Sequence, residues 1–533
     1  MTRRGTAAVL LFAVLINLPF LGKAYSLDAP YYLAIARQIL AHPRHPLAFS
    51  YNWFGTLAPV AGFQHSVLVP YLLAPLLALT KGREALMRLC LLPVDLLAAV
   101  SLYGLAAEFL QEPLWPALIV LACPSFFLCM PQVMLEAWIV ALSLASLWAL
   151  AASFRPGRGR WFWASALLAS TAIVIKHTAV FLLPLLLAEL VRRKVPPRRL
   201  AAYMLLALAP AAADALWLEP WRLRATESLS SGISPLFQLR TFLAFAGGCG
   251  AVTLAWPYAR AESPRRSHAL RAVAALAAVL LLFSPIADAR GAPIRLLDRA
   301  TGILFAWPAL LALLELAEPK ARARPGWGLW AAWIAADSAM LLLAPWNLSG
   351  RSMLFLLPPL ILSSASRLES ALEPRRLRRV YAASLAGTLA LSLALGWVDA
   401  RYADAQRELA ASVQRALIDR GRRVWVNGHW GFQYYMEKAG AVEMDARAGG
   451  WKEVRPGDAV VFPSVNVVTL RRDAGVWRLP PAAVVESRVP LRLMSFRSSQ
   501  AGFYSNLWGF LPFALSREPI DAFRIVTTRA DKR

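Results

Sequence analysis

The sequence lacks the short motifs that mark several large enzyme classes. It contains no P-loop, no HExxH, no GxSxG and no GxGxxG at the start of a helix. It has only four cysteines, Cys90, Cys123, Cys129 and Cys249, and none of them forms a CxxC pair. A zinc site or a disulfide framework is therefore not indicated, and we interpret the cysteines as small buried side chains. ATP-driven transport and metalloprotease chemistry find no support.

Acidic residues are also few, with 32 Asp and Glu against 57 Lys and Arg, so the net charge is +25. Such a charge can indicate a nucleic-acid partner. Here, however, the basic residues gather in short loops between apolar segments, which is typical of the cytoplasmic loops of membrane proteins. We therefore expect contact with membrane lipids and no nucleic-acid partner.

Long apolar runs dominate what is present. The chain of 533 residues is 58% hydrophobic and has a mean hydropathy of +0.49. We predict a mostly α fold, a polytopic transmembrane bundle of about 13 spans. The predicted spans are 6–25, 66–80, 86–110, 133–153, 161–175, 178–191, 200–218, 239–258, 270–287, 300–316, 328–346, 352–366 and 380–398. The first is interpreted as a retained helix and not as a cleaved signal peptide.

The basic loop residues determine the predicted topology. Alternate loops hold roughly 25 and roughly 9 Lys and Arg residues, and the richer set is assigned to the cytoplasm. That set includes Lys81, Arg83 and Arg88. The assignment requires the proline-broken segment 113–131 to be a short or re-entrant piece and not a span. The N-terminus is then cytoplasmic, and the Ala- and Arg-rich composition favours a bacterial inner membrane.

Two parts follow from this topology, a membrane domain over 1–398 with a long external loop at 26–65, and an external domain over 399–533. The second part has no apolar run of membrane length. Its pattern predicts a small α/β domain. The expected elements are a helix at 402–420, a strand at 423–427, a helix at 431–440, a strand at 458–463 and irregular strands ending at 523–528.

The stretch AYSLDAPYYLAIARQIL, residues 24–40, carries one acid, Asp28, next to the predicted membrane. It predicts an interfacial helix with one apolar face. Asp28 precedes Pro30 and so fits a helix N-cap. A functional carboxylate is the open alternative. The apolar face is expected to comprise Tyr32, Ile35, Ala36, Ile39 and Leu40, with Arg37 and Gln38 on the other side.

Two further ionisable positions are predicted near the same membrane face. Glu136 begins a long apolar helix, where an acid is costly unless it faces a cavity or a partner. A charge favoured by the helix dipole is the alternative for Glu136. Lys176 and His177 lie in a shallow turn between two short apolar arms, where a lysine can pair with an anionic group or simply reach water.

Arginines on the predicted external side run against the charge bias and suggest phosphate binding. Arg290, Arg295 and Arg299 fit a solvated loop equally well, whereas Arg351 stands at the mouth of a helix. In the first external loop, Tyr51, Trp53 and Phe54 can stack on a sugar or form an interfacial aromatic belt.

Taken in order, these residues resemble the GT-C membrane glycosyltransferases, in particular glycosyltransferase family 39, which includes protein O-mannosyltransferases and aminoarabinose lipid A transferases. The resemblance covers nearly the whole chain through short, degenerate motifs. They are Asp28 with YYLAIAR (Tyr31 to Arg37), the segment from His65 to Pro70, Glu136 before a long helix, Lys176 in IVIKHTAVFLLP, Arg351 before FLLPPLIL, and the tail from VWVNGHWGFQYYMEKAG to AGFYSNLWGFLPF.

The resemblance implies transfer of a sugar, hexose or pentose, from a polyprenyl-phosphate donor to a lipid, glycan or protein on the external face, with inversion. It implies Asp28 and Glu136 as catalytic residues, the first as base. It implies Lys176, Arg351 and His177 as ligands of the donor phosphate, and Tyr31, Tyr32, Trp53 and His65 as contacts to the acceptor or sugar. It leaves room for a divalent metal, for which the sequence identifies no ligands.

Two other functions remain open at this point. A transporter or flippase of a lipid-linked or anionic substrate would place charges near the bilayer midplane and show repeat symmetry, and no internal repeat is seen. A sensor or assembly protein would use residues 399–533 as its working part. Replacing Asp28 and Glu136 would then leave the function intact.

Overall fold

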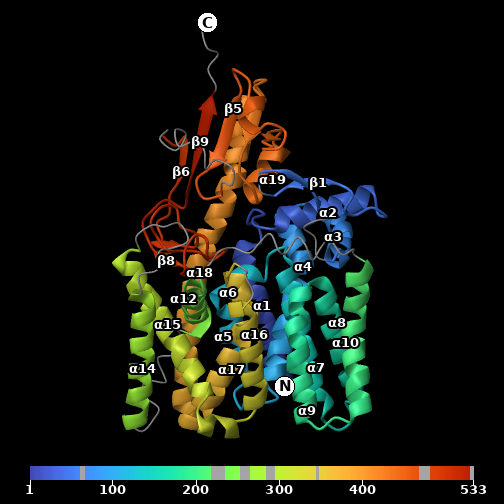
Figure 1. Ribbon diagram of the computed structural model, residues 1–533, viewed down its shortest axis with the longest axis vertical. Coiled ribbons are helices and arrows are strands. Elements are labelled where there is room, and N and C mark those ends of the chain that lie inside the picture. The colour runs from blue at the N-terminus through green and yellow to red at the C-terminus, as the bar shows by residue number, and fades with distance from the viewer. Residues whose placement is uncertain are drawn as a thin grey trace.

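The computed structural model describes residues 1–53, 55–60, 66–217, 234–251, 264–283, 294–343, 347–466 and 480–527. Long helices form a bundle, and a smaller domain built from the C-terminal part of the chain sits on one end of it (Figure 1). We call that end the domain end. The opposite end, called the far end, is marked by the hydrogen bond from the Thr2 backbone N–H to the Tyr103 hydroxyl and by the ion pair of Arg378 with Glu112.

Within the described residues the helices of the bundle follow the apolar runs closely, and the ends of the predicted spans at 252–258, 284–287 and 344–346 lie outside those residues. These helices are α1 (Arg3–Asn17), α4 (Glu84–Ala106), α5 (Leu114–Ala122), α6 (Pro124–Cys129), α7 (Leu135–Ser153), α8 (Arg160–Ile175), α9 (Leu182–Arg192), α10 (Pro197–Trp217), α12 (Pro235–Ala246), α14 (Pro264–Phe283), α15 (Leu296–Leu316), α16 (Trp327–Leu343), α17 (Met353–Ala371) and α18 (Pro374–Val413).

Five described helical segments are long and apolar enough to cross a membrane, which makes the chain a multi-pass membrane protein. They are α1 with the turn that follows it (Arg3–Phe20), α4, α7, α15, and α18 with the π-helix that follows it (Pro374–Ile418). At the centre, α7 packs against α4 and α8. Polar side chains there bond to one another, since the Ser165 hydroxyl lies 3.1 Å from that of Ser146 and 2.7 Å from that of Tyr203.

The predicted span at 66–80 is wrong. It folds as α3 (Leu68–Thr80), which packs on α2 (Ala29–Ala41) at the domain end (Figure 1). The Tyr25 hydroxyl donates to the Gly82 carbonyl just after α3, so the helix returns to the end from which it starts. With 13 residues it extends only about 20 Å, well below the roughly 30 Å apolar thickness of a bilayer.

Segment 113–131, predicted not to span, does run between the two ends. Near its start, the Gln111 backbone N–H donates to Glu369 at the far end, and just after its close Gln132 donates to Tyr504 of the C-terminal domain. The chain breaks at Pro124, between α5 and α6, as the prolines suggest. Segment 66–80 does not cross the bundle as predicted, whereas segment 113–131 does. The number of crossings before α7 is therefore unchanged, and the later helices keep their predicted directions.

The basic residues after α3 lie at the domain end, contrary to the predicted topology. Arg88 accounts for part of this exception, because its guanidinium is buried and donates to the carbonyls of Leu21, Lys23 and Ala24. It is therefore a structural arginine that fixes the turn after α1. The charge rule counts it as a loop charge although it is not in a loop.

The predicted span 380–398 and the predicted helix 402–420 are one element. Helix α18 is continuous for 40 residues, about 60 Å, and ends in a π-helical turn over Gln414–Ile418. Residues 399–413 contain neither Gly nor Pro, so nothing stops the helix at the membrane boundary. The helix therefore joins the bundle rigidly to the C-terminal domain.

The C-terminal domain is built on a five-stranded sheet of order β4-β3-β5-β9-β6. Strands β4 and β5 run parallel to β3, whereas β9 is antiparallel to β5 and β6. The strands expected at 423–427 and 458–463 are present as β3 and β5. The sheet comprises β3 (Val424–Val426), β4 (Val442–Glu443), β5 (Ala459–Pro463), β6 (Ala483–Val485) and β9 (Asp521–Thr527), with α19 (Gly431–Lys438) between β3 and β4.

Two short pairs of antiparallel strands lie outside this sheet. Strands β1 (Ser50–Asn52) and β2 (Leu57–Pro59) form one of them in the loop after α2, and β7 (Leu491–Arg492) pairs with β8 (Ala514–Leu515) in the other. The Asn52 side chain donates to the Met444 carbonyl, so the first strand pair is attached to the sheet domain. The domain end is thus covered by α2, α3 and both strand pairs.

Candidate functional site

Four ionisable side chains from distant parts of the chain meet at the domain end. Nζ of Lys176 lies 2.6 Å from Oε1 of Glu136, and Nε of Arg351 lies 3.7 Å from the same oxygen. Nη1 of Arg351 lies 2.5 Å from Oδ2 of Asp28. Cations and anions alternate in the order Lys176, Glu136, Arg351, Asp28. We call these four residues the ion-pair chain, and its formal charge is zero.

Asp28 occupies the N-cap position of α2, but its side chain makes no capping hydrogen bond. Only its backbone carbonyl accepts from the first helical N–H groups. The preceding Leu27 has a positive φ of 55°, an uncommon conformation for a leucine, and it is buried. Such strained turns persist where the surrounding fold demands them. This turn directs the Asp28 carboxylate to Arg351 instead of to the helix end.

Glu136 stands in the first turn of α7 and is only 5% exposed. Its Oε1 carries both contacts to Lys176 and Arg351. Its Oε2 is buried and has no hydrogen-bond partner within the described residues. A buried carboxylate oxygen without a donor is rare, because the lost hydration must be replaced. This oxygen is therefore available to a donor group of a bound substrate.

Lys176 lies where α8 ends. Its backbone is extended, at φ −152° and ψ 118°, and a short 3-10 turn, His177–Phe181, follows before α9. The predicted shallow turn is thus present, and it presents the lysine to Glu136. His177 points elsewhere, since its Nε2 lies 3.5 Å from Oδ2 of Asp214 on α10. The structure does not bring His177 into the ion-pair chain, and no sequence pattern indicates its partner Asp214.

Arg351 is held by the C-terminal domain. It lies in a 3-10 turn, Gly350–Ser352, just before α17. The Gly350 N–H donates to the Phe503 carbonyl at 2.5 Å, and the Asn506 N–H donates to the Leu348 carbonyl at 2.9 Å. Gly350 packs so closely on the Phe503 ring that a Cβ there would overlap it. The position of the guanidinium therefore depends on the loop at 503–506.

Aromatic side chains from α2 and β1 gather beside the acids. Ring centroids of Tyr31 lie 5.2 Å from Tyr51 and 4.9 Å from Trp53. Tyr32 is buried, and burial together with the carboxylates of Asp28 and Glu136 raises the pKa of its phenol well above the usual value. His65 and Phe54 lie outside the described residues.

The expected apolar face of α2 is correct except at its end. Tyr32, Ile35, Ala36 and Ile39 are buried, whereas Leu40 is 47% exposed. Arg37 is exposed, as predicted, and its guanidinium donates to the Tyr434 hydroxyl of α19. The helix therefore lies between the bundle and the C-terminal domain, so its polar side contacts protein as well as solvent.

A buried polar network that the sequence did not reveal supports the ion-pair chain. Asp399 on α18 binds the Lys23 ammonium and accepts from the Tyr504 hydroxyl at 2.6 Å. Tyr504 in turn accepts from the Gln132 amide at 3.3 Å. Gln132 lies four positions before Glu136, and Tyr504 follows Phe503. The network therefore connects the loops that position Glu136 and Arg351.

Two of the other predicted arginines, Arg295 and Arg299, have structural partners. Arg295 forms two hydrogen bonds to Asp298 in its own helix turn and donates to the Leu515 carbonyl. Arg299 stacks over the Phe283 ring. Arg290 lies outside the described residues. Of the three external arginines that the structure describes, only Arg351 lies in the ion-pair chain.

The acids of this site do not fit a metal centre. Each of Asp28 and Glu136 is already paired with a cation, and Arg351 stands between them. In the part of the chain that the structure describes, no three His, Cys, Asp or Glu side chains lie close enough together to hold a metal ion.

No protein-family model and no curated protein matches the chain. Similar solved structures include ArnT from Cupriavidus metallidurans in the apo state, with a TM-score of 0.42, and the same protein bound to undecaprenyl phosphate, with a TM-score of 0.44. In both cases the identity is 16%, and the match covers 86% of this chain and 93% of the other. With TM-scores below 0.5, the chain is similar to these structures only in outline, and its own side-chain geometry must support any functional conclusion.

Proposed function

We propose that this protein is an integral-membrane glycosyltransferase that takes a sugar from a polyprenyl-phosphate donor and transfers it to a hydroxyl or amine of a lipid, glycan or protein. The observation that carries the proposal is the ion-pair chain. Two cations suited to a phosphate alternate there with two carboxylates suited to proton transfer. The sequence resemblance described above singles out the same four residues.

The donor phosphate would bind between Lys176 and Arg351. Lys176 is paired with Glu136 and Arg351 with Asp28, so a bound phosphate would take over part of the contacts that these carboxylates make. During transfer the anomeric C–O bond to phosphate breaks, and the leaving group changes from a diester anion to a monoester with more charge. Cations fixed beside that oxygen stabilise the transition state more than the ground state.

Asp28 would act as the general base. Once Arg351 has turned to the phosphate, the Asp28 carboxylate is free to accept a proton from the acceptor. The acceptor oxygen or nitrogen then forms the new bond to the anomeric carbon, the carbon–phosphate oxygen bond breaks, and the proton stays on Asp28 until water or phosphate removes it. Attack from the side opposite the phosphate inverts the anomeric centre.

Glu136 and the aromatic side chains would hold the substrates in place. The free Oε2 of Glu136 is suited to accept a hydrogen bond from a sugar or acceptor hydroxyl. The cluster of Tyr31, Tyr51 and Trp53 offers a ring surface of the kind that packs against the C–H face of a sugar. His177 is not assigned a role in this scheme.

The location of the site favours chemistry on a lipid headgroup. The ion-pair chain lies at the domain end and not midway along the bundle, which suits a donor whose lipid tail stays in the bilayer. We propose that this end faces outward from a bacterial inner membrane, with the N-terminus in the cytoplasm. The C-terminal domain would then serve as a support for Arg351 and for acceptor recognition.

The test is whether a covalent product forms. The full-length protein in proteoliposomes would be given a polyprenyl-phosphate sugar labelled in the sugar, and lipids, glycans and proteins would be analysed by mass spectrometry. The proposal predicts a labelled sugar attached to a new acceptor, and a matching glycan or lipid missing from the envelope of a deletion strain. A donor that changes leaflet with its sugar still on phosphate would establish a flippase instead.

A further inference from the structure

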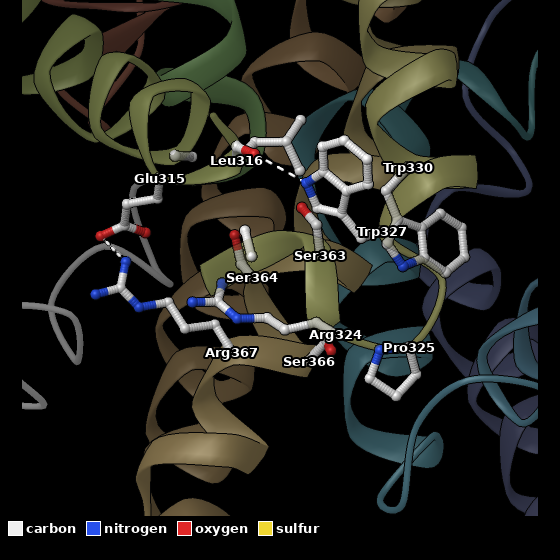
Figure 2. A pocket seen from close by; sticks show the side chains of 12 residues that line it. Glu315, Leu316, Arg324, Pro325, Trp327, Trp330, Ser363, Ser364, Ser366 and Arg367 are labelled. Carbon is white, nitrogen blue, oxygen red and sulfur yellow. Dashed lines mark hydrogen bonds and ion pairs between the residues drawn. The ribbon is translucent and has the colours of Figure 1, made fainter. Parts of the chain in front are cut away.

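A polar pocket opens at the far end of the bundle, away from the ion-pair chain. It lies where α15 ends and α16 begins, and α17 forms its floor (Figure 2). Arg295, just before α15, contacts the Leu515 carbonyl of the C-terminal domain, and α15 then runs for 21 residues, about 30 Å, before reaching the pocket at Glu315 and Leu316. The two sites are thus at opposite ends.

The pocket carries one positive charge in excess. The Arg367 guanidinium pairs with the Glu315 carboxylate, and both side chains are almost completely buried. Arg324 adds a second guanidinium, which extends into the same space (Figure 2). Among the described residues, no carboxylate pairs with Arg324. Glu315 is therefore neutralised by Arg367, and Arg324 remains to attract an anion.

The other polar groups of the pocket include several hydrogen-bond donors. The hydroxyls of Ser364 and Ser366 line it, and both residues are buried. The indole N–H of Trp330 also belongs to the lining, is buried and has no acceptor within the described part of the chain. A buried indole N–H normally finds an acceptor. A set of donors with one uncompensated cation is suited to phosphate oxygens.

The size of the pocket limits what can enter. The space between its lining residues is about 330 Å³ with the open mouth included, and atoms crowd it so closely that only about one water molecule fits within it. A phosphate group would therefore sit at the mouth, with one oxygen directed inward and Arg324 beside it. A nucleotide or a second sugar would not fit.

An apolar cavity adjoins this pocket. With its open mouth included it has a volume of about 1030 Å³, against about 330 Å³ for the polar pocket, and it lies between α12, α14, α15 and α16. Leu316 lines both spaces, so the cavity begins where the polar pocket ends. Its lining is almost entirely aliphatic or aromatic, with Leu243, Leu310 and Ile334 as examples. A phosphate that carries a hydrocarbon chain matches both spaces at once.

We propose that these two spaces form a binding site for an anionic phospholipid, with its phosphate beside Arg324 and one acyl chain in the apolar cavity. The site would be structural or regulatory and separate from the donor site. It stands whether or not the ion-pair chain transfers sugar, because none of its residues belongs to that chain. The lipid would come from the leaflet at the far end.

Thermal unfolding of the full-length protein in neutral detergent would test this proposal. The added probes are phosphatidylglycerol, phosphatidylcholine and inorganic phosphate. The matched variants are Arg324→Gln and Arg376→Gln, the latter an exposed arginine at the same end of the bundle. Phosphatidylglycerol should raise the unfolding temperature of the wild type and of Arg376→Gln by several degrees, and its apparent affinity should fall about tenfold or more in Arg324→Gln.

Each other outcome contradicts a definite part of the proposal. Equal stabilisation by phosphatidylcholine would show that the negative charge is irrelevant. Full stabilisation by inorganic phosphate would show that binding needs no acyl chain and that the pocket is a site for free anions. An Arg324→Gln protein that phosphatidylglycerol stabilises as much as the wild type would show that Arg324 does not bind the lipid. Arg324→Lys keeps the charge without the guanidinium fork and should bind with intermediate affinity.

Discussion

Nη1 of Arg351 lies 2.5 Å from Oδ2 of Asp28, although 323 positions separate the two residues in the sequence. The contact joins the start of α2 to the turn before α17 and withdraws the carboxylate from its helix-capping position. In this structure the proposed base, Asp28, and a proposed phosphate ligand, Arg351, are therefore paired with each other. Arg351 can serve a phosphate only by loosening its hold on Asp28.

This pairing predicts an order of binding. The donor should bind first, because its phosphate draws Arg351 away and frees Asp28 for the acceptor. Steady-state transfer kinetics should then show polyprenyl phosphate, the second product, competing with the donor and not with the acceptor. An Arg351→Lys variant should lose about tenfold or more in donor affinity, because a lysine lacks the bidentate fork. Random-order kinetics would contradict the exchange.

Lys176 and Glu136 should be mutually dependent for stability. Their side chains are 15% and 7% exposed, so removing one leaves a largely buried charge. Lys176→Met or Glu136→Leu alone should each lower the free energy of unfolding by about 3 kcal/mol, and the double variant should lose much less.

Thermal unfolding in detergent would measure this coupling. Arg401→Gln is a matched control, since Arg401 and Glu408 form an ion pair that is 37% and 60% exposed. Breaking such a pair changes stability by about 1 kcal/mol or less. Additive losses in the Lys176 and Glu136 variants would show that the two side chains do not support each other.

The Gly350 position predicts a mechanical link between the C-terminal domain and the site. Gly350→Ala should push the turn that carries Arg351 away from the Phe503 ring, and transfer should fall at least tenfold while the protein stays folded. Phe503→Leu removes the rigid ring and should restore part of the activity when combined with Gly350→Ala.

Phe503→Leu alone serves as the control and should retain most activity, since the backbone hydrogen bond from Gly350 to residue 503 does not need the ring. If the double variant is no better than Gly350→Ala, the overlap with the ring is not the cause of the loss. Circular dichroism and gel filtration of all three variants would confirm folding.

Glu443 and Glu437 of the C-terminal domain predict a pH dependence of stability. Partial burial and the neighbouring Glu437 carboxyl raise the pKa of Glu443, and partial loss of solvent also raises the pKa of Glu437, which keeps an exposed side. Gln433, Arg37, Tyr51 and Asp445 also face this pair. The pair holds a proton in the folded state that the unfolded chain releases near pH 4 to 5, the usual carboxyl range.

The sign of the effect follows from proton linkage. Between the carboxyl pKa of the unfolded chain and the raised pKa of the folded pair, the folded state binds more protons, so stability falls as the pH rises. Glu443→Gln should flatten this loss and raise the unfolding temperature by a few degrees at pH 8. Glu486→Gln, at an exposed glutamate after β6, should leave the pH profile unchanged. An unaltered slope in Glu443→Gln would show that the two carboxyls do not share a proton.

The local sequence pattern predicts most helices and two central strands, because apolar runs and β-branched stretches are determined by residues close together in the sequence. The assignment of α3 and of segment 113–131 failed because hydropathy does not distinguish a membrane-crossing helix from an apolar helix that packs on protein. The length of α3 and its contacts with α2 decide the matter. The continuity of α18 cannot be predicted for a similar reason, because a change from apolar to polar residues within one helix resembles the end of an element.

The candidate site was predicted in part. The predicted topology puts Asp28, Glu136, Lys176 and Arg351 at one end of the bundle. A charged residue next to an apolar run can be recognised directly in a sequence. The network of Lys23, Asp399 and Tyr504 carries no such signal. Lys23 and Asp399 are 376 positions apart. In the sequence, each fits an ordinary charged residue at the end of a predicted helix. Pairings of this kind emerge only when the chain is folded.

The most direct test of the central claim is the single-turnover rate of sugar transfer by Asp28→Asn at saturating polyprenyl-phosphate donor. The asparagine keeps the size of the side chain but cannot accept a proton as a base, so the rate should fall at least 100-fold while donor binding persists. Asp404→Asn is the control, because Asp404 lies at the same end on α18, where it pairs with Arg407, and its variant should turn over normally. Transfer by Asp28→Asn at the wild-type rate would contradict the role of Asp28 and, with it, the proposed chemistry of the ion-pair chain.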